Sequence, residues 1–289
     1  MLKKSTILHL RIPFSFFLLP VYMFALAVSP HRDPAEVLLI FVILHLFLYP
    51  ASNGYNSYFD KDEDSIGGLE KPPPVSKELY YISLTFDLIG LLLGFLIGWE
   101  FVVMAFIYGL ISKAYSHPWT RWKKYPWWGW FIAGFFQGFF TFLMVYSGLN
   151  GLGWHVFTMV EVLLPALLTS LLLWGSYPMT QVYQHKEDSR RGDRTISLRL
   201  GVMGTFHFVA AVFTLASFGF LWYFWEGYSW QVAGLFQLFL VPVLFYFFRW
   251  YLRVRKDRAM ADFRSTMRLN MISAACMNGF FLLLIFIIG

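Results

Sequence analysis

Side chains that carry oxygen recur every four residues in one stretch of the chain, at Asn56, Asp60 and Asp64. In a helix, residues four apart share a face, so a helix through this stretch places the three in one polar ladder and turns Asp62 and Glu63 elsewhere. Mg²⁺ prefers oxygen ligands and is commonly held by one or two carboxylates together with substrate phosphates. The spacing favours a magnesium site, although a solvated acidic loop explains this stretch alone equally well.

A second acidic stretch runs from Gln184 to Thr195 and contains Glu187 and Asp188 among several arginines. Carboxylates from two distant stretches can share a divalent cation only if the fold brings them together. Acidic and basic side chains in one place also suit a bound diphosphate, because metal ions and Arg or Lys side chains both neutralise phosphate charge. The recurrence therefore favours the metal site over the solvated loop.

The elements that must position these residues are expected to lie in a membrane. The 289 residues are 58% hydrophobic and only 14% charged, with a mean hydropathy of +0.56, whereas an ordinary soluble domain is roughly 25% charged. A soluble globule and a disordered chain are both excluded by this composition. The single cysteine, Cys276, allows no intrachain disulfide and no Cys-based zinc site. The net charge of +6 is better explained by membrane topology than by nucleic acid, which we do not expect as a partner.

Nine segments are apolar enough to form membrane-spanning helices, which need about 20 residues each. The segment from Phe101 is short and must recruit flanking residues to complete a span. The nine segments are Ile12–Ser29, Ala35–Tyr55, Leu79–Gly98, Phe101–Ile111, Trp127–Val145, Phe157–Thr180, Val202–Phe224, Trp230–Phe248 and Leu269–Ile288.

Basic residues give an independent test of this count, because Lys and Arg collect on the cytoplasmic side of a membrane. With nine spans and a cytoplasmic N-terminus, every Lys and Arg except Arg32 falls on the cytoplasmic side. The alternative is a cleaved secretory signal ending at Ala25-Leu26-Ala27, which would remove the first span. We predict an all-α, polytopic membrane protein that forms one domain over residues 1–289. Its nine helices surround a central cavity that opens near the cytoplasmic face, and its C-terminus lies outside.

These features together resemble the UbiA superfamily of intramembrane prenyltransferases. That family has nine helices, an N-x-x-x-D-x-x-x-D motif after the second and a D-x-x-x-D motif after the sixth. The first motif matches Asn56, Asp60 and Asp64, and the second falls on Gln184 and Asp188, so that glutamine replaces one aspartate. A downstream Gly, Thr and Gly recur as in the family, at Gly192, Thr195 and Gly201.

The resemblance implies a Mg²⁺-dependent enzyme that moves a prenyl group from a prenyl diphosphate to an aromatic or other lipophilic acceptor. It also implies contact with membrane lipids and a place in a bacterial inner membrane. The residues expected to act in catalysis are Asp60, Asp64 and Asp188. Those expected to hold metal are Asn56, Asp60, Asp64, Gln184 and Asp188. Those expected to bind substrate are Asn56, Lys71, Tyr115, Arg121, Lys123, Lys124, Gln184 and Arg194.

The glutamine at position 184 leaves a second interpretation open. A Gln oxygen can bind a metal ion but removes a negative charge, and Glu187 could compensate only with a shifted geometry. A family member that has lost a metal ligand could instead act as a membrane transporter or scaffold. That alternative predicts no Mg²⁺ dependence and no prenylated product.

Overall fold

The computed structural model describes residues 3–288, and this part of the chain contains helices, turns and loops but no β-strand. The predicted all-α fold is confirmed. The α-helices are α1 (Lys4–Leu10), α2 (Leu19–Val28), α3 (Pro34–Val42), α4 (Tyr49–Asp60), α5 (Glu78–Gly94), α6 (Trp99–Ser116), α7 (Pro126–Gly134), α8 (Thr141–Asn150), α9 (Val160–Ser176), α10 (His185–Arg191), α11 (Ile196–Gly227), α12 (Trp230–Lys256) and α13 (Phe263–Ile288). Short 3₁₀ or π segments join or flank them at η1 (Ile12–Phe17), η2 (Ile43–Leu48), η3 (Trp122–Lys124), η4 (Phe135–Phe140), η5 (Gly153–Thr158), η6 (Tyr177–Thr180) and η7 (Arg258–Met260).

Several of these helices run on without a break, so they form fewer and longer rods. Six rods among the described residues are long and apolar enough to cross a membrane, and a seventh is added if the bent pair Lys4–Phe17 and Leu19–Val28 counts as one span. The helices α5, with 17 residues, and α6, which includes Glu100 and Lys113, are not among them. The count of nine spans therefore stays a prediction. The six are Pro34–Asp60, Pro126–Asn150, Val160–Thr180, Ile196–Gly227, Trp230–Lys256 and Phe263–Ile287.

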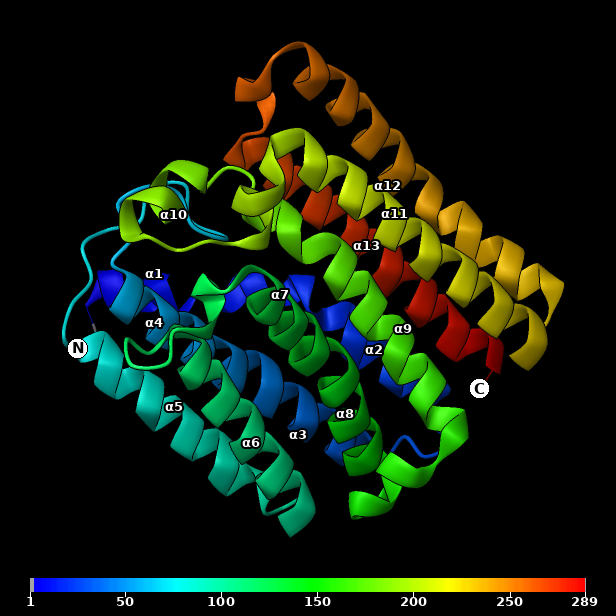
Figure 1. Cartoon of the computed structure of the whole chain (residues 1–289). Coiled ribbons are helices and arrows are strands. Elements are labelled where there is room, and N and C mark those ends of the chain that lie inside the picture. The colour runs from blue at the N-terminus through cyan, green and yellow to red at the C-terminus, as the bar shows by residue number, and fades with distance from the viewer. Residues whose placement is uncertain (1–2, 289) are drawn as a thin grey trace.

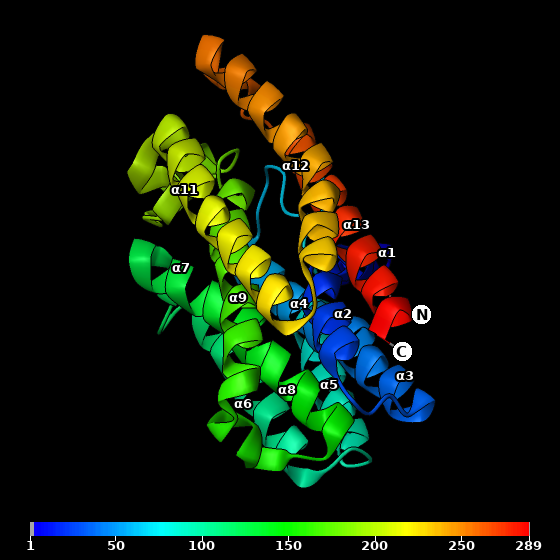
Figure 2. The same cartoon turned by 90° about the vertical axis from the view of Figure 1, so that its right-hand side faces the viewer.

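The helices lie side by side along one common direction, which runs from upper left to lower right in Figure 1. The N-terminal end, the loop after α4 and the short helix α10 gather at the upper left, whereas the C-terminal end lies at the lower right. Figure 2 shows the same bundle from the side, with α7 and α11 on one flank and α1 and α13 on the other. Both acidic stretches therefore lie at the same end of the bundle.

Buried aromatic rings hold the two ends of the sequence together. Phe24 of α2 stacks on Phe281 of α13 with ring centroids 4.7 Å apart, and it also contacts Phe220 of α11. All three side chains are fully buried. Aromatic pairs of this kind contribute about 0.5–1.5 kcal/mol beyond the area that they bury. These contacts fix α2 against α11 and α13.

Candidate active site

The first acidic stretch does not continue as a helix. Helix α4 ends at Asp60, because Lys61 adopts the left-handed conformation (φ 49°, ψ 45°) and its N–H donates to the carbonyl oxygen of Ser57. A residue in this conformation is a common way to end a helix. The predicted ladder through Asn56, Asp60 and Asp64 is therefore wrong, because Asp64 lies in the loop beyond the turn.

This turn exchanges the roles of two neighbouring carboxylates. Asp62, which we expected to point away, lines the cavity and forms an ion pair with Arg191. Asp64 is absent from the cavity wall, its side chain is 55% exposed, and it lies 3.6 Å from Arg190. Burial and the nearby Asp60 carboxylate raise the pKa of Asp62. The loop thus brings a different acid into the cavity from the one that the spacing predicts.

The second acidic stretch does fold as a helix, and glycine ends it. Gly192 adopts the left-handed conformation (φ 73°) after α10, which costs glycine little because it has no Cβ. The N–H of Asp193 then donates to the carbonyl oxygen of Asp188 over 3.0 Å. The chain is folded back at this point, so that the side chains of Asp188 and Asp193 line the same cavity.

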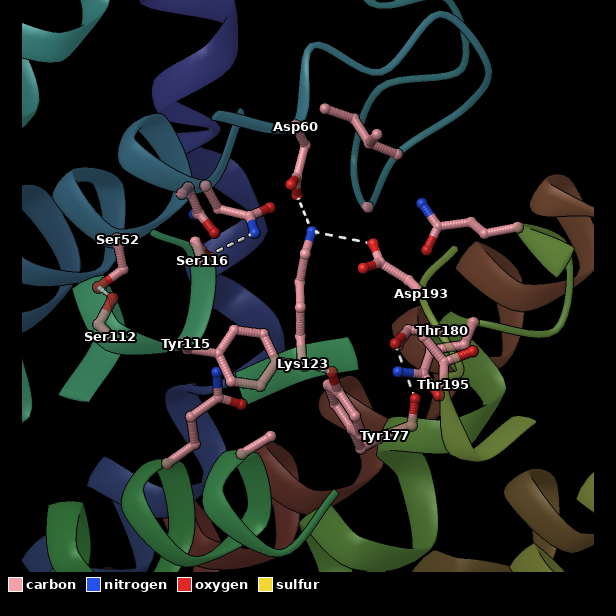
Figure 3. A pocket seen from close by; sticks show the side chains of 18 of the residues that line it. Ser52, Asp60, Ser112, Tyr115, Ser116, Lys123, Tyr177, Thr180, Asp193 and Thr195 are labelled. Atoms are coloured by element: carbon pink, nitrogen blue, oxygen red, sulfur yellow. Dashed lines mark hydrogen bonds and ion pairs between the residues drawn. The ribbon is translucent and has the colours of Figure 1, made fainter. Parts of the chain in front are cut away.

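One cavity collects both acidic stretches. Four buried or partly buried carboxylates line it, and they come from the end of α4, the following loop, α10 and the turn after α10. Arg11, Lys123 and Arg191 line it as well, so that acidic and basic side chains share the mouth. Figure 3 shows Lys123 reaching between Asp60 and Asp193. The four carboxylates belong to Asp60, Asp62, Asp188 and Asp193.

Cationic side chains of the protein pair with these acids. Lys123 forms an ion pair with Asp60 and lies 3.9 Å from Asp193. Arg121 grips Asp193 with two hydrogen bonds, Nε to Oδ1 over 2.7 Å and Nη2 to Oδ2 over 2.8 Å. Such forked pairs are strong and fix direction as well as distance. Arg121 also approaches Asp60 to 3.6 Å, so the loop before α7 links both acidic stretches.

Apolar side chains also line the cavity, together with neutral polar ones such as Ser112 and Gln137. Ile111 lies one turn before the end of α6, and Ile132, Ala133 and Phe136 lie on the rod that begins with α7. The hydroxyls of Tyr115 and Tyr177, which also line the cavity, form a hydrogen bond, and both side chains lie near Lys123 in Figure 3. The cavity therefore suits a ligand with a charged head and an apolar tail.

Asp188 of α10 is buried, and its surroundings disfavour the ionised form. Burial raises the pKa of Asp188 to about 7, although the Thr195 hydroxyl opposes this by donating to Oδ2 over 2.9 Å. A carboxylate in such a place gains most from a nearby cation. A divalent ion bound here would therefore hold Asp188 ionised.

The donor atoms fit a divalent cation, although they do not form a closed site. No group of three or more His, Cys, Asp or Glu side chains in the described part of the chain is arranged to hold a metal ion. Asp60 Oδ1, however, is buried without a hydrogen-bond partner, and Lys123 occupies the space between the two acidic stretches. The oxygen atoms around the Lys123 ammonium group belong to carboxylates, and carboxylate oxygens are ligands that Mg²⁺ prefers.

Six of the predicted site residues line the cavity, and a seventh, Arg121, binds two of the carboxylates that do. Gln184 lines it through a side chain whose amide donates to the carbonyl oxygen of Ser65 over 3.1 Å. The six are Asn56, Asp60, Tyr115, Lys123, Gln184 and Asp188. Four predicted residues lie outside the wall: Asp64, Lys71, Lys124 and Arg194.

Sequence reasoning missed four charged residues of the wall, which are Arg11, Asp62, Arg191 and Asp193. Arg11 is buried and donates to the carbonyl oxygens of Gly67 and Asn53. No spacing of neighbouring residues in the sequence indicates these contacts. A helix stop at Gly192 is a recognised signal, and it could have indicated that Asp193 turns back toward Asp188.

A second cavity lies between α9, α11, α12 and α13, and it contains no acidic or basic side chain. Its wall is mostly apolar, with residues such as Val209, Phe213 and Leu269, and only amides and hydroxyls provide polarity. Nothing in it could bind a phosphate by charge. Chemistry on a charged ligand is therefore assigned to the first cavity.

Comparison with known proteins identifies relatives of the whole chain. The profile of the UbiA prenyltransferase family matches residues 17–272. No curated protein matches by sequence. A solved structure from work on digeranylgeranylglyceryl phosphate synthase in membranes is similar, with a TM-score of 0.61 at 20% identity over 98% of both chains.

Two further structures are of a UbiA homologue from Archaeoglobus fulgidus. The one bound to DMAPP and Mg²⁺ has a TM-score of 0.67 at 14% identity, and the comparison covers 98% of this chain and 100% of the other. The one bound to GPP and Mg²⁺ has a TM-score of 0.66 at 14% identity, covering 98% and 99%. At these identities the likeness shows a shared fold.

Proposed function

Because the chain belongs to the UbiA prenyltransferase family, we propose that it transfers a prenyl group from a prenyl diphosphate to a lipophilic acceptor within the membrane. One observation carries this proposal: a single cavity is lined by carboxylates and basic side chains and also by apolar side chains. The relatives from Archaeoglobus fulgidus that bind GPP or DMAPP with Mg²⁺ support the same class of donor.

The charged mouth would bind the diphosphate. Asp60, Asp62 and Asp188 would hold Mg²⁺, which acts as a Lewis acid on the leaving diphosphate when bound. Lys123 and Arg191 would turn from the carboxylates to phosphate oxygens, where their charge opposes the negative charge that develops as the C–O bond breaks. Asn56, whose Nδ2 donates to the Ser116 hydroxyl over 2.8 Å, would offer its amide oxygen to the Mg²⁺ ion.

The apolar part of the cavity would protect the allylic cation from water. Tyr115 and Tyr177 line the same cavity as the charged side chains, so the reacting carbon would sit near their rings. The face of an aromatic ring stabilises a desolvated cation by about 2 kcal/mol. These two tyrosines would therefore stabilise the cation until the acceptor attacks it.

We further propose that α5 and α6 complete nine membrane crossings, with the N-terminus and the charged cavity mouth on the cytoplasmic side. This topology agrees with the distribution of basic residues in the sequence. Asp87 of α5 forms an ion pair with Lys113 of α6, so that the charge of each is compensated within the bundle. Asp64, Lys71, Lys124 and Arg194 retain their predicted roles only if the mouth rearranges around the donor.

The test uses purified protein in detergent or nanodiscs with radiolabelled prenyl diphosphates and a panel of lipophilic acceptors. We expect a prenylated product that requires Mg²⁺, disappears with a chelator and is lost in Asp60→Ala. Product that survives both chelation and this substitution would refute the assignment. Absence of product with every donor, combined with absence of Mg²⁺ binding, would favour the transporter or scaffold interpretation that Gln184 suggests.

A further inference from the structure

Position 184 leaves the α10 side of the cavity short of one negative charge. Gln184 lines the cavity, but its amide is neutral and its nitrogen is engaged by the carbonyl of Ser65. The acid that the sequence offers as a substitute, Glu187, is absent from the cavity wall and pairs with Arg190 at 3.2 Å and Arg191 at 2.8 Å. Glu187 therefore supports the outer arginines and does not replace the missing carboxylate.

Asp193, unlike Glu187, places a carboxylate in the cavity wall. Its side chain is 2% exposed, lines the cavity beside Gln184 and Asp188, and points toward Lys123 in Figure 3. The left-handed turn at Gly192 and the hydrogen bond from Asp193 N–H to Asp188 fix its direction. A buried carboxylate needs a cation or several hydrogen bonds to remain ionised, and here Arg121 and Lys123 supply them.

We propose that Asp193 supplies the carboxylate that Gln184 lacks, so that Asp188 and Asp193 together hold the divalent cation on the α10 side of the site. This inference rests on the proposed function, because it concerns the same cavity and the same metal. The cavity keeps four carboxylates although one motif position has lost its acid. Arg121 would pass from Asp193 to the diphosphate when the metal ion arrives.

Two observations indicate that positive charge is stabilised between the two acidic stretches. Asp60 Oδ1 is buried, faces the same cavity and has no hydrogen-bond partner. The ammonium group of Lys123 already lies between Asp60 and Asp193, which marks this space as one where positive charge is stabilised from both sides. A divalent cation in this space would neutralise the Asp60 and Asp193 carboxylates with a greater charge than the Lys123 ammonium group carries.

The experiment measures cation binding without substrate, by following free Mn²⁺ with electron paramagnetic resonance while it is titrated into the purified protein. We expect Asp193→Asn to weaken Mn²⁺ binding about tenfold or more. The double variant Asp193→Asn with Gln184→Asp should recover most of the lost affinity, because the carboxylate returns at the motif position. Glu187→Gln is the matched control, since it removes an acid from the same segment but not from the cavity, and it should bind as the native protein does.

The outcomes distinguish a role of Asp193 as a metal ligand from a role in which Asp193 only orients Arg121. Native affinity in Asp193→Asn would overturn the proposal. Weak binding that Gln184→Asp does not restore would also overturn it, because it would mean that Asp193 only orients Arg121. Asp193→Glu should retain binding, which guards against a general folding defect. If Asp60→Asn and Asp188→Asn also bind Mn²⁺ like the native protein, the proposed function itself fails.

Discussion

The two acidic stretches deliver carboxylates to one cavity by different backbones. In the first, Asp60 ends a long helix and Asp62 follows a left-handed turn. In the second, Asp188 lies within a short helix and Asp193 follows a left-handed glycine. Spacing by four residues therefore predicts that Gln184 and Asp188 line one cavity, as they do, and fails between Asp60 and Asp64, where the helix stops.

The two stretches also differ in how firmly they are supported. Helix α4 is the end of a rod of 27 residues that begins at Pro34 and packs inside the bundle. Helix α10 has seven residues and is tied to its neighbours by contacts such as the Arg191–Asp62 ion pair and the bond from Arg194 N–H to the Lys124 carbonyl. Short segments held by few contacts open more readily. We therefore expect the first stretch to be essential for activity and the second to be adjustable.

Removal of the Asp60 carboxylate should have the largest effect. This side chain pairs with Lys123 and approaches Arg121 and Arg191, so its loss leaves positive charge without a partner as well as removing a predicted metal ligand. We expect Asp60→Asn to lower kcat/KM for prenyl transfer by about 10³-fold. Steady-state kinetics would measure this, with Glu70→Gln as the control, because Glu70 is an exposed acid that pairs only with Arg264 within residues 3–288. If Asp60→Asn lowers kcat/KM no more than Glu70→Gln does, Asp60 is not part of the active site.

Asp188→Asn should reduce activity less, by about 10²-fold. Asp193 remains on the same side of the cavity in this variant and retains part of the negative charge. If Asp188→Asn lowers kcat/KM more than Asp60→Asn does in the same assay, the expected difference between the two stretches is wrong. That ranking would mean that the short helix, and not the long one, dominates metal binding.

The loop after α4 offers the sharpest comparison, because it contains one acid inside the cavity and one outside. We expect Asp62→Asn to lower kcat/KM about tenfold, as loss of a group that supports a metal site does. Asp64→Asn should change it little, since Asp64 is half exposed and pairs only with Arg190 among the described residues. If Asp64→Asn lowers kcat/KM more than Asp62→Asn does, the loop rearranges when substrate binds. The spacing of Asn56, Asp60 and Asp64 would then describe the substrate-bound site.

Much of the fold could be predicted from the sequence, because apolar rods follow from composition alone. The predicted start of the seventh span at Val202 coincides with the break in α11 at Gly201 (φ 69°). The pairing of both acidic stretches at one end of the bundle was also predictable, since both follow apolar rods and precede basic residues. The choice of Asp62 over Asp64 was not, because it depends on the left-handed turn at Lys61, a residue type that does not favour that conformation.

Arg11 illustrates a different limit. It becomes part of the site through bonds to carbonyl groups in α4 and in the loop that follows, which lie more than 40 residues away. Contacts of this kind depend on the packing of α1 against α4 and leave no local spacing to detect. The sequence could therefore predict Arg121 and Lys123, which belong to a basic loop, but not Arg11, which only the tertiary fold brings to the site.

The smallest effect should come from Gly192, and it tests whether a backbone turn creates the second half of the site. A Cβ at this position meets no atom within 4 Å, so only the left-handed backbone (φ 73°) resists substitution. Non-glycine residues lose about 1–2 kcal/mol in this conformation, and a turn that relaxes would carry Asp193 away from the cavity. We expect Gly192→Ala to lower Mn²⁺ affinity severalfold, measured by the same titration.

Gly227→Ala is the matched control for this prediction, because a Cβ there also meets no atom within 4 Å and Gly227 is not among the glycines with positive φ. It ends α11 at the other end of the bundle and should leave cation binding unchanged. Equal behaviour of the two variants would mean that Asp193 reaches the cavity without help from the turn. A loss confined to Gly192→Ala would instead assign the difference between the two acidic stretches to their backbones, since no carboxylate is altered in either variant.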